Sequence, residues 1–89
     1  MAVLVTAEVP GMTPERYDPM LVALGDKLKQ AKGFIAHAAG MSDDGWRVVE
    51  LWETADDATR WFAENVYPNL PPGVTPKRTL VELHNLVTR

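Results

Sequence analysis

Residues 34–54 read FIAHAAGMSDDGWRVVELWET and decide the fold. Two strand-like runs, residues 34–41 and 46–53, are separated by Ser42-Asp43-Asp44-Gly45. A short polar connection that ends in glycine between two such runs is typical of a β-hairpin. We therefore expect two adjacent antiparallel strands in the middle of the chain.

A strand and a helix precede this hairpin. Residues 2–9 are rich in Val, Leu and Thr and stop at Pro10-Gly11, which predicts a first strand that ends in a turn. Thr13 then fits an N-cap, with Pro14 at the first helical position. Apolar residues follow at helical spacing: Tyr17, Met20, Leu21, Leu24 and Leu28.

Pro19 lies inside this amphipathic pattern and removes one backbone donor. The helix either bends mildly at Pro19 or begins only at Asp18-Pro19, and we prefer the bend. Gly33 is expected to stop the helix at its C-terminal side.

A second helix and a last strand follow the hairpin. Thr54 is expected to cap the helix, with Asp57 completing a weak capping box. Residues 67–76 hold four of the seven prolines and are expected to form a loop, and residues 78–87 are expected to form a fourth strand. The side chains that share one face of the second helix are Ala58, Trp61, Phe62 and Asn65.

The order strand, helix, strand, strand, helix, strand predicts an α+β, ferredoxin-like βαββαβ fold in one domain, residues 1–89. In this fold a four-stranded antiparallel sheet carries both helices on one face. The opposite face must be covered by another sheet or left to water.

Side-chain alternation assigns the strand residues to two faces. We consider two arrangements: helices on the mixed face with the apolar face bare, which we prefer, or the reverse. The apolar face collects Val3, Val5, Ala7, Val9, Phe34, Ala36, Ala38, Val49, Leu51, Val81 and Leu83. The mixed face collects Leu4, Thr6, Glu8, Ile35, His37, Ala39, Val48, Glu50, Trp52, Leu80, Glu82 and His84.

A bare apolar face predicts a homodimer. Covering about 500 Å² of apolar surface at about 25 cal/mol per Å² contributes roughly 12 kcal/mol before the costs of association. If the helices cover the apolar face instead, the argument for a pocket beside the mixed face weakens.

Composition excludes several functions. The net charge is −3 without a basic patch, which argues against a nucleic-acid partner, and no apolar run is long enough to cross a membrane. There is no cysteine, and the two histidines, His37 and His84, have no neighbours at metal-ligand spacing, so we expect no metal site. With no signal peptide recognised, the expected compartment is the cytoplasm.

The residues also carry a family resemblance. The runs GFIAH (33–37), WRVVELWET (46–54) and WF (61–62) resemble small members of the antibiotic biosynthesis monooxygenase group. The resemblance implies a dimeric α+β barrel, in which two sheets face each other and each subunit has a pocket between its sheet and its helices. The group includes oxygenases of aromatic polyketides that need no metal, flavin or haem, so no cofactor is expected.

The same group includes haem-degrading enzymes. These carry a helical histidine about ten residues beyond the tryptophan that corresponds to Trp61. Residues 65–72 contain no histidine, so haem degradation is not expected here.

Two histidines are the candidate catalytic residues. His37 lies in mid-strand between Ile35 and Ala39, where an imidazole can act as a general base near neutral pH. The alternative is a structural histidine paired with Glu50 or Glu82. His84 is of the same type but is expected on an edge strand.

The candidate substrate-binding residues are Trp61, Trp52, Thr6, Tyr67 and Glu50. By the resemblance, Trp61 would line the pocket and stack on a planar substrate, although a plain core tryptophan explains it equally well. Tyr67 opens the proline-rich loop and could close the pocket mouth.

These observations predict a cofactor-independent, monooxygenase-like tailoring enzyme that acts on a planar aromatic or polyketide-type molecule through proton abstraction by His37. One alternative is a cyclase or isomerase that uses the same pocket without oxygen. The other is a dimeric accessory protein that binds a small hydrophobic molecule without chemistry.

Overall fold

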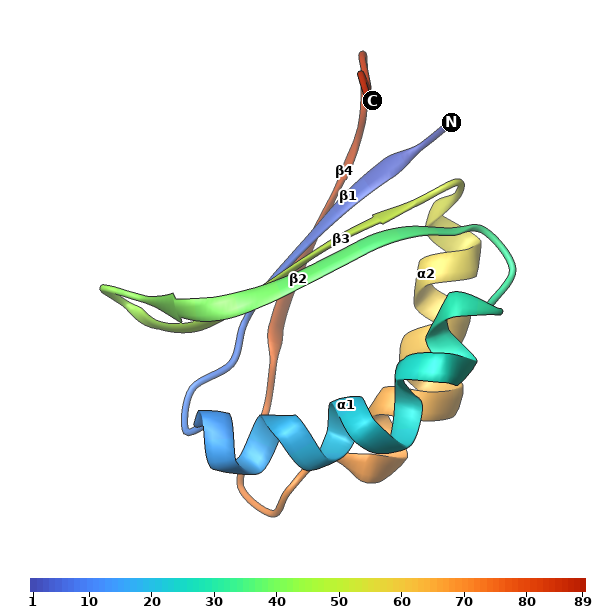
Figure 1. Ribbon diagram of the computed structural model, residues 1–89. Coiled ribbons are helices and arrows are strands. Elements are labelled where there is room, and N and C mark those ends of the chain that lie inside the picture. The colour runs from blue at the N-terminus through green and yellow to red at the C-terminus, as the bar shows by residue number, and fades with distance from the viewer.

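A computed structural model describes residues 1–89 (Figure 1). The strands are β1 (Val3–Glu8), β2 (Phe34–Ser42), β3 (Gly45–Trp52) and β4 (Lys77–Glu82), and the helices are α1 (Pro14–Lys29) and α2 (Ala55–Trp61). A π-helical turn, Phe62–Val66, and a 3-10 turn, Tyr67–Asn69, continue α2 into the proline-rich segment. No helix has the length and apolar character needed to cross a membrane.

The four strands form one antiparallel sheet in the order β2-β3-β1-β4. Figure 1 shows α1 and α2 on the same side of this sheet, with no element over the other side. Strand order and one-sided cover are those of a ferredoxin-like α+β fold, so the predicted fold class is confirmed.

Both helices begin at the predicted caps. The Thr13 hydroxyl oxygen accepts a hydrogen bond from the backbone N–H of Arg16 at 3.3 Å, and the Thr54 hydroxyl oxygen accepts one from Asp57 at 3.1 Å. α1 continues without interruption through Pro19, so the alternative start at Asp18 is wrong. These caps satisfy backbone donors that would otherwise lack a partner at each helix start.

The start of β2 contains an irregularity that decides which side chains face the helices. Phe34 is opposite Trp52 of β3, but Ala36 is opposite Leu51, so the register shifts by one residue at this point. Because successive strand residues alternate between faces, a regular strand would separate Phe34 from His37. The bulge places both on the helix side, so the grouping of Phe34 with Ala36 is wrong.

The predicted faces need a second correction at β1. Val3 is opposite Trp52 and Val5 is opposite Glu50, so the odd residues of β1 share a face with the even residues of β3. The helices do cover the face that carries His37, but Val3 and Val5 lie on it too, and Thr6 lies on the bare face. Odd-numbered residues of one strand need not share a face with odd-numbered residues of another strand. The register of each strand pair decides which residues lie on the same face.

The core lies between the helices and this corrected face, in two clusters. The first gathers under α2 and the end of α1, and the second under the start of α1. The first consists of Val3, Val5, Leu28, Trp52, Ala58 and Trp61, and the second of Ala7, Val9, Met12, Trp46 and Val74.

β4 is shorter than predicted. It ends at Glu82, and only one further backbone hydrogen bond, from Leu83 N–H to the carbonyl of Ala2 at 2.8 Å, ties the next residue to the sheet edge. Residues 84–89 lie outside the sheet and are exposed, so the strand predicted for residues 78–87 is wrong in its second half.

Candidate functional site

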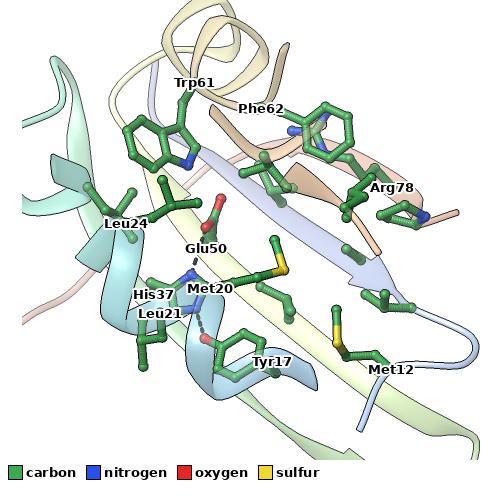
Figure 2. Close-up of a pocket in the computed structure, with 18 of the residues that line it drawn as sticks. Met12, Tyr17, Met20, Leu21, Leu24, His37, Glu50, Trp61, Phe62 and Arg78 are labelled. Atoms are coloured by element: carbon green, nitrogen blue, oxygen red, sulfur yellow. Dashed lines mark hydrogen bonds and ion pairs between the residues drawn. The ribbon is translucent and has the colours of Figure 1, made fainter. Parts of the chain in front are cut away.

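A cavity of about 100 Å³ lies between the sheet and the helices. Its lining includes residues of both core clusters, and 15 of the 20 lining residues are hydrophobic. Figure 2 shows how the labelled side chains surround it. An apolar cavity reached by a few polar groups is typical of a small-molecule site. The lining side chains that carry polar atoms are Tyr17, His37, Trp46, Glu50, Trp61 and Arg78.

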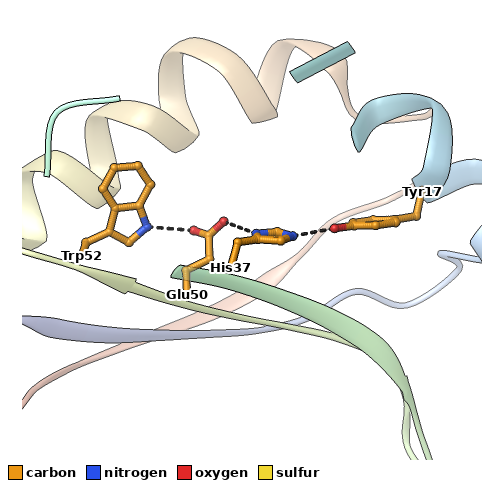
Figure 3. Close-up of polar contacts among 4 residues, drawn as sticks. All are labelled: Tyr17, His37, Glu50 and Trp52. Atoms are coloured by element: carbon orange, nitrogen blue, oxygen red, sulfur yellow. Dashed lines mark hydrogen bonds and ion pairs between the residues drawn. The ribbon is translucent and has the colours of Figure 1, made fainter. Parts of the chain in front are cut away.

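Four side chains form one continuous hydrogen-bonded chain beside this cavity (Figure 3). The indole Nε1–H of Trp52 donates to Oε1 of Glu50 at 3.0 Å. The other carboxylate oxygen of Glu50, Oε2, lies 2.7 Å from Nδ1 of His37. The hydroxyl group of Tyr17 is hydrogen-bonded to Nε2 of His37 at 2.5 Å. Both oxygens of Glu50 and both ring nitrogens of His37 are therefore engaged.

Sheet geometry explains why three of these groups meet. His37 and Glu50 are directly opposite each other on β2 and β3, where cross-strand side chains lie within contact distance. Trp52 follows Glu50 by two residues on β3 and therefore projects to the same face. Tyr17 comes from the first turn of α1 above this face and closes the chain of hydrogen bonds.

The carboxylate fixes the proton positions in this chain. An ionised Glu50 only accepts hydrogen bonds, so Nδ1 of His37 carries the proton that points to Glu50. In the neutral imidazole Nε2 is then the acceptor, and the Tyr17 hydroxyl donates to it. The arrangement presents a basic nitrogen, oriented from behind by a carboxylate, to a hydroxyl group at the cavity wall.

Tyr17 itself stays protonated. Burial raises the pKa of the Tyr17 hydroxyl above its usual value of 10.0, and the charges of Glu50 and Asp18 raise it further. A phenolate at this position would be poorly solvated and would lie close to a carboxylate. Tyr17 can thus donate or pass on a proton near neutral pH but does not rest as an anion.

Trp46 contributes an unused donor close to Tyr17. Their rings are 5.0 Å apart between centroids, and Trp46 is 8% exposed. Its indole Nε1–H is buried and has no hydrogen-bond acceptor. Buried donors normally have a partner, so this N–H is available to a neighbouring acceptor.

Arg78 supplies a positive charge at another part of the cavity wall. Its guanidinium carbon lies 4.1 Å from the centroid of the Phe62 ring, and Figure 2 shows both side chains on the far side of the cavity from Tyr17. Burial lowers the pKa of Arg78, and the negative charge of Glu50 acts in the opposite direction. Burial disfavours the charged form of a guanidinium, whereas a nearby carboxylate favours it.

The structure brings together only part of the predicted site. His37, Glu50 and Trp61 all line the cavity. Trp52 is fully buried and is absent from the lining, but it holds Glu50 in place through its indole N–H.

The other candidates lie elsewhere. Thr6 is opposite Val49 and Thr79 on the bare sheet face, away from the cavity. His84 is exposed beyond the end of β4. Tyr67 is 68% exposed in the 3-10 turn and does not line the cavity.

Three residues of the cavity wall, Tyr17, Arg78 and Trp46, are not among the candidates that the sequence predicts. Tyr17 was assigned only to the apolar stripe of the first helix, although its hydroxyl made it the one polar side chain in that stripe. Arg78 begins the predicted last strand, and only the register of β4 shows that it shares a face with the cavity. Trp46 begins the strand predicted for residues 46–53, and its place beside the hairpin gave no sign that it is buried.

No protein-family model and no curated protein matches this sequence. The comparison with solved structures does find similar folds. SnoaB from Streptomyces nogalater, described as a cofactor-independent oxygenase, superposes in its N63A form with a TM-score of 0.68. The two sequences are 15% identical, and the match covers 99% of this chain and 97% of SnoaB.

Two further structures have the same fold. A predicted monooxygenase from Shewanella loihica PV-4 gives a TM-score of 0.66 at 17% identity, over 96% of each chain. The heme-degrader MhuD from Mycobacterium tuberculosis, solved with two hemes in its active site, gives 0.63 at 16% identity. That match covers 99% of this chain and 100% of MhuD. The expected likeness to the antibiotic biosynthesis monooxygenase fold is therefore confirmed.

Proposed function

We propose that this chain, which has the fold of the antibiotic biosynthesis monooxygenases, is a cofactor-independent tailoring enzyme that oxidises a planar aromatic or polyketide-type molecule. SnoaB, which shares the fold over nearly its whole length, is described as a cofactor-independent oxygenase. In this proposal His37 is the base, Tyr17 passes or donates the proton, and Glu50 orients the imidazole.

One observation carries the proposal: the hydrogen-bonded chain from Trp52 through Glu50 and His37 to Tyr17 ends at an apolar cavity. A substrate hydroxyl that donates to the Tyr17 oxygen can lose its proton while Tyr17 passes its own proton to Nε2 of His37. The imidazolium that results keeps its Nδ1–H on the Glu50 carboxylate, which stabilises the new positive charge.

The deprotonated ring is the electron-rich species that reacts with oxygen. Dioxygen adds to a ring carbon, and the resulting hydroperoxide loses water to leave a carbonyl group. For a conjugated CH₂ group the balance is R₂CH₂ plus O₂ gives R₂C=O plus H₂O, so the substrate supplies all four electrons that reduce dioxygen and no external reductant is needed. The chain's own contribution is proton transfer, orientation and exclusion of water.

The apolar lining supports this role. Trp61 is 7% exposed and presents its ring to the cavity, where it can pack against a planar molecule. The few polar groups lie at the Tyr17 side and at Arg78, so a ring held between them would have its polar substituents at defined positions.

We further propose that two copies of the chain form a homodimer through their bare sheet faces, so that the sheet of each copy covers that of the other. Its centre is apolar, with Leu4 opposite Leu51 and Val81, and a thin single domain gains stability when such a face is covered. Thr6 and Glu8 place polar groups toward one end of this face.

An isomerase or cyclase that works without oxygen remains the second candidate. It is favoured by one feature: the Tyr17–His37 pair holds both a proton acceptor and a proton donor, which is what moving a proton between two positions of a substrate requires. Oxygen consumption separates this candidate from the first.

Haem fits the cavity residues poorly. MhuD binds hemes in its active site, but here His37 is the only histidine on the cavity wall, and both of its ring nitrogens are hydrogen-bonded. An iron atom could be ligated by His37 only after the contact with Tyr17 or Glu50 is broken.

The proposed function is tested by oxygen uptake with a panel of electron-rich phenols and anthrone-type compounds. Wild-type protein should consume oxygen without added metal, flavin or reductant, and label from ¹⁸O₂ should enter the product carbonyl. His37→Ala should lower the rate about 100-fold or more, the size expected for loss of a general base. Equal rates in wild type and His37→Ala would remove His37 from the mechanism.

A further inference from the structure

Arg78 is placed in the cavity wall by the register of β4. It is opposite Ala7 of β1, a residue buried on the helix side of the sheet, so its side chain projects toward the helices. The guanidinium lies over the ring of Phe62, and both residues line the cavity. Arg78 is half-buried there, not extended into solvent.

The guanidinium has no acceptor within the chain. The ion pairs of the molecule are His37–Glu50, Arg47–Glu8 and Arg60–Asp57, and no side-chain hydrogen bond involves Arg78. A guanidinium carries five N–H donors. Arg78 is half-buried, and none of its nitrogen atoms is among the fully buried atoms that lack a partner, so these donors are open to water or to a ligand. The contact with Phe62 uses the charge and leaves these donors unpaired.

Glu50 is not a hydrogen-bond acceptor for the Arg78 guanidinium. It is close enough for its charge to act on Arg78, but its two oxygens are held by Trp52 and His37. The cavity is therefore flanked by a carboxylate-backed proton acceptor near Tyr17 and by an unpaired cation near Phe62. A ligand carboxylate that enters already charged would be repelled at the Glu50 side and attracted at the Arg78 side, whereas a phenolate formed at Tyr17 arises together with a positive imidazolium on His37.

We infer that Arg78 is the binding group for a carboxylate of the substrate, so that the molecule bound in this cavity is an aromatic acid held with its carboxylate on Arg78 and its hydroxyl at Tyr17. The inference rests on the proposed function, because it assigns a substrate class and an orientation to the same site. The planar fork of a guanidinium matches the two oxygens of a carboxylate, and such charge-assisted pairs are the strong hydrogen bonds of proteins.

Binding affinity for two matched probes tests this inference. The probes are a hydroxynaphthoic acid, with its hydroxyl and carboxyl groups at opposite ends of the ring system, and its primary amide. Titration calorimetry at about pH 7 compares wild type, Arg78→Gln and Arg78→Lys. The matched control is Arg60→Gln, which removes the same charge from the exposed face of α2.

Wild type and Arg60→Gln should bind the acid about tenfold or more tightly than the amide, the size expected for a charged hydrogen-bonded pair. Arg78→Gln should bind both probes with similar affinity, and Arg78→Lys should keep part of the preference. The inference is overturned if Arg78→Gln keeps the full preference, if wild type shows none, or if wild type binds neither probe at millimolar concentration.

Two safeguards keep the result interpretable. If Arg78→Gln does not fold, as judged by circular dichroism, the test uses Arg78→Lys. The inference then requires that Arg78→Lys prefers the acid over the amide less strongly than wild type does. Oxygen uptake is measured separately: an acid preference that depends on Arg78 without any oxygen consumption leaves this inference standing and rejects the proposed oxygenase. Oxygen consumption without an acid preference that depends on Arg78 rejects this inference and leaves the proposed oxygenase standing.

Discussion

Individual side chains decide what this cavity can do. Glu50 accepts from Trp52 and from His37, so the imidazole has one orientation and one tautomer. From sequence alone, the pairing of His37 with Glu50 was one of two alternatives, because either Glu50 or Glu82 could have been opposite. Tyr17 could not have been placed against His37, since the two lie on elements whose relative position depends on tertiary packing.

The raised pKa of Tyr17 gives the protein a specific sensitivity to alkaline pH. The folded state holds the Tyr17 proton more tightly than the unfolded chain, whose value is near 10.0. The stability that this contributes is fully present below about pH 10 and is lost as the pH rises through the folded pKa. Tyr17→Phe should remove this loss, so its melting temperature should fall less than that of wild type between about pH 9 and 11.

Tyr67→Phe is the matched control, because Tyr67 is 68% exposed. Its melting temperature should follow the pH dependence of wild type. If Tyr17→Phe and Tyr67→Phe show the same alkaline loss as wild type, Tyr17 is not the group that titrates.

The elements of the fold follow largely from local sequence signals. Thr13 and Thr54 cap their helices as predicted, and the hairpin after Ser42 has the expected connection. The bulge in β2 and the π-helical turn Phe62–Val66 carried no recognisable signal. Both arise where tertiary packing overrides a regular repeat, and such irregularities are common near functional sites.

Gly33 joins α1 to β2 and should not tolerate a side chain. Its φ is +82°, and a Cβ atom would lie 2.2 Å from Oδ2 of the buried Asp57 at the start of α2. Gly33→Ala should lower the free energy of unfolding by about 1–3 kcal/mol in urea titrations, from backbone strain and displacement of Asp57.

Gly40→Ala, a substitution inside β2, provides the comparison. No atom lies within 4 Å of the position of its Cβ, and its backbone is not in the left-handed region. Its free energy of unfolding should stay within about 0.5 kcal/mol of wild type. Equal losses in the two variants would show that the contact with Asp57 has no energetic weight.

The whole molecule is a sheet with helices on one face, and that much was predictable from element order. The assignment of side chains to faces was not, because it depends on the register between β1 and β3 and on the bulge in β2. The error matters for function: the predicted faces put Thr6 on the cavity side and Val5 on the bare face, whereas the structure has Val5 at the cavity and Thr6 on the bare face. Alternation along a strand divides its residues between the two faces of the sheet. Only the pairing between strands shows which residues of different strands share a face.

The bare face leads to a prediction about assembly. Leu51→Arg introduces a charge at the apolar centre of this face and should convert a dimer into a monomer in sedimentation experiments, with the circular dichroism spectrum unchanged. Val22→Arg is the control, because Val22 is 87% exposed on α1, and it should remain dimeric. A wild-type protein that stays monomeric at high concentration would contradict the proposed interface.

Proton transfer from ligand to His37 is the central claim, and the absorbance spectrum of a bound phenol tests it most directly. In wild type at about pH 7, the hydroxynaphthoic acid described above should show the red-shifted band of its phenolate once bound, and in His37→Ala it should keep the spectrum of the neutral phenol. A bound ligand that remains neutral in wild type, or ionises equally in both proteins, would contradict the account.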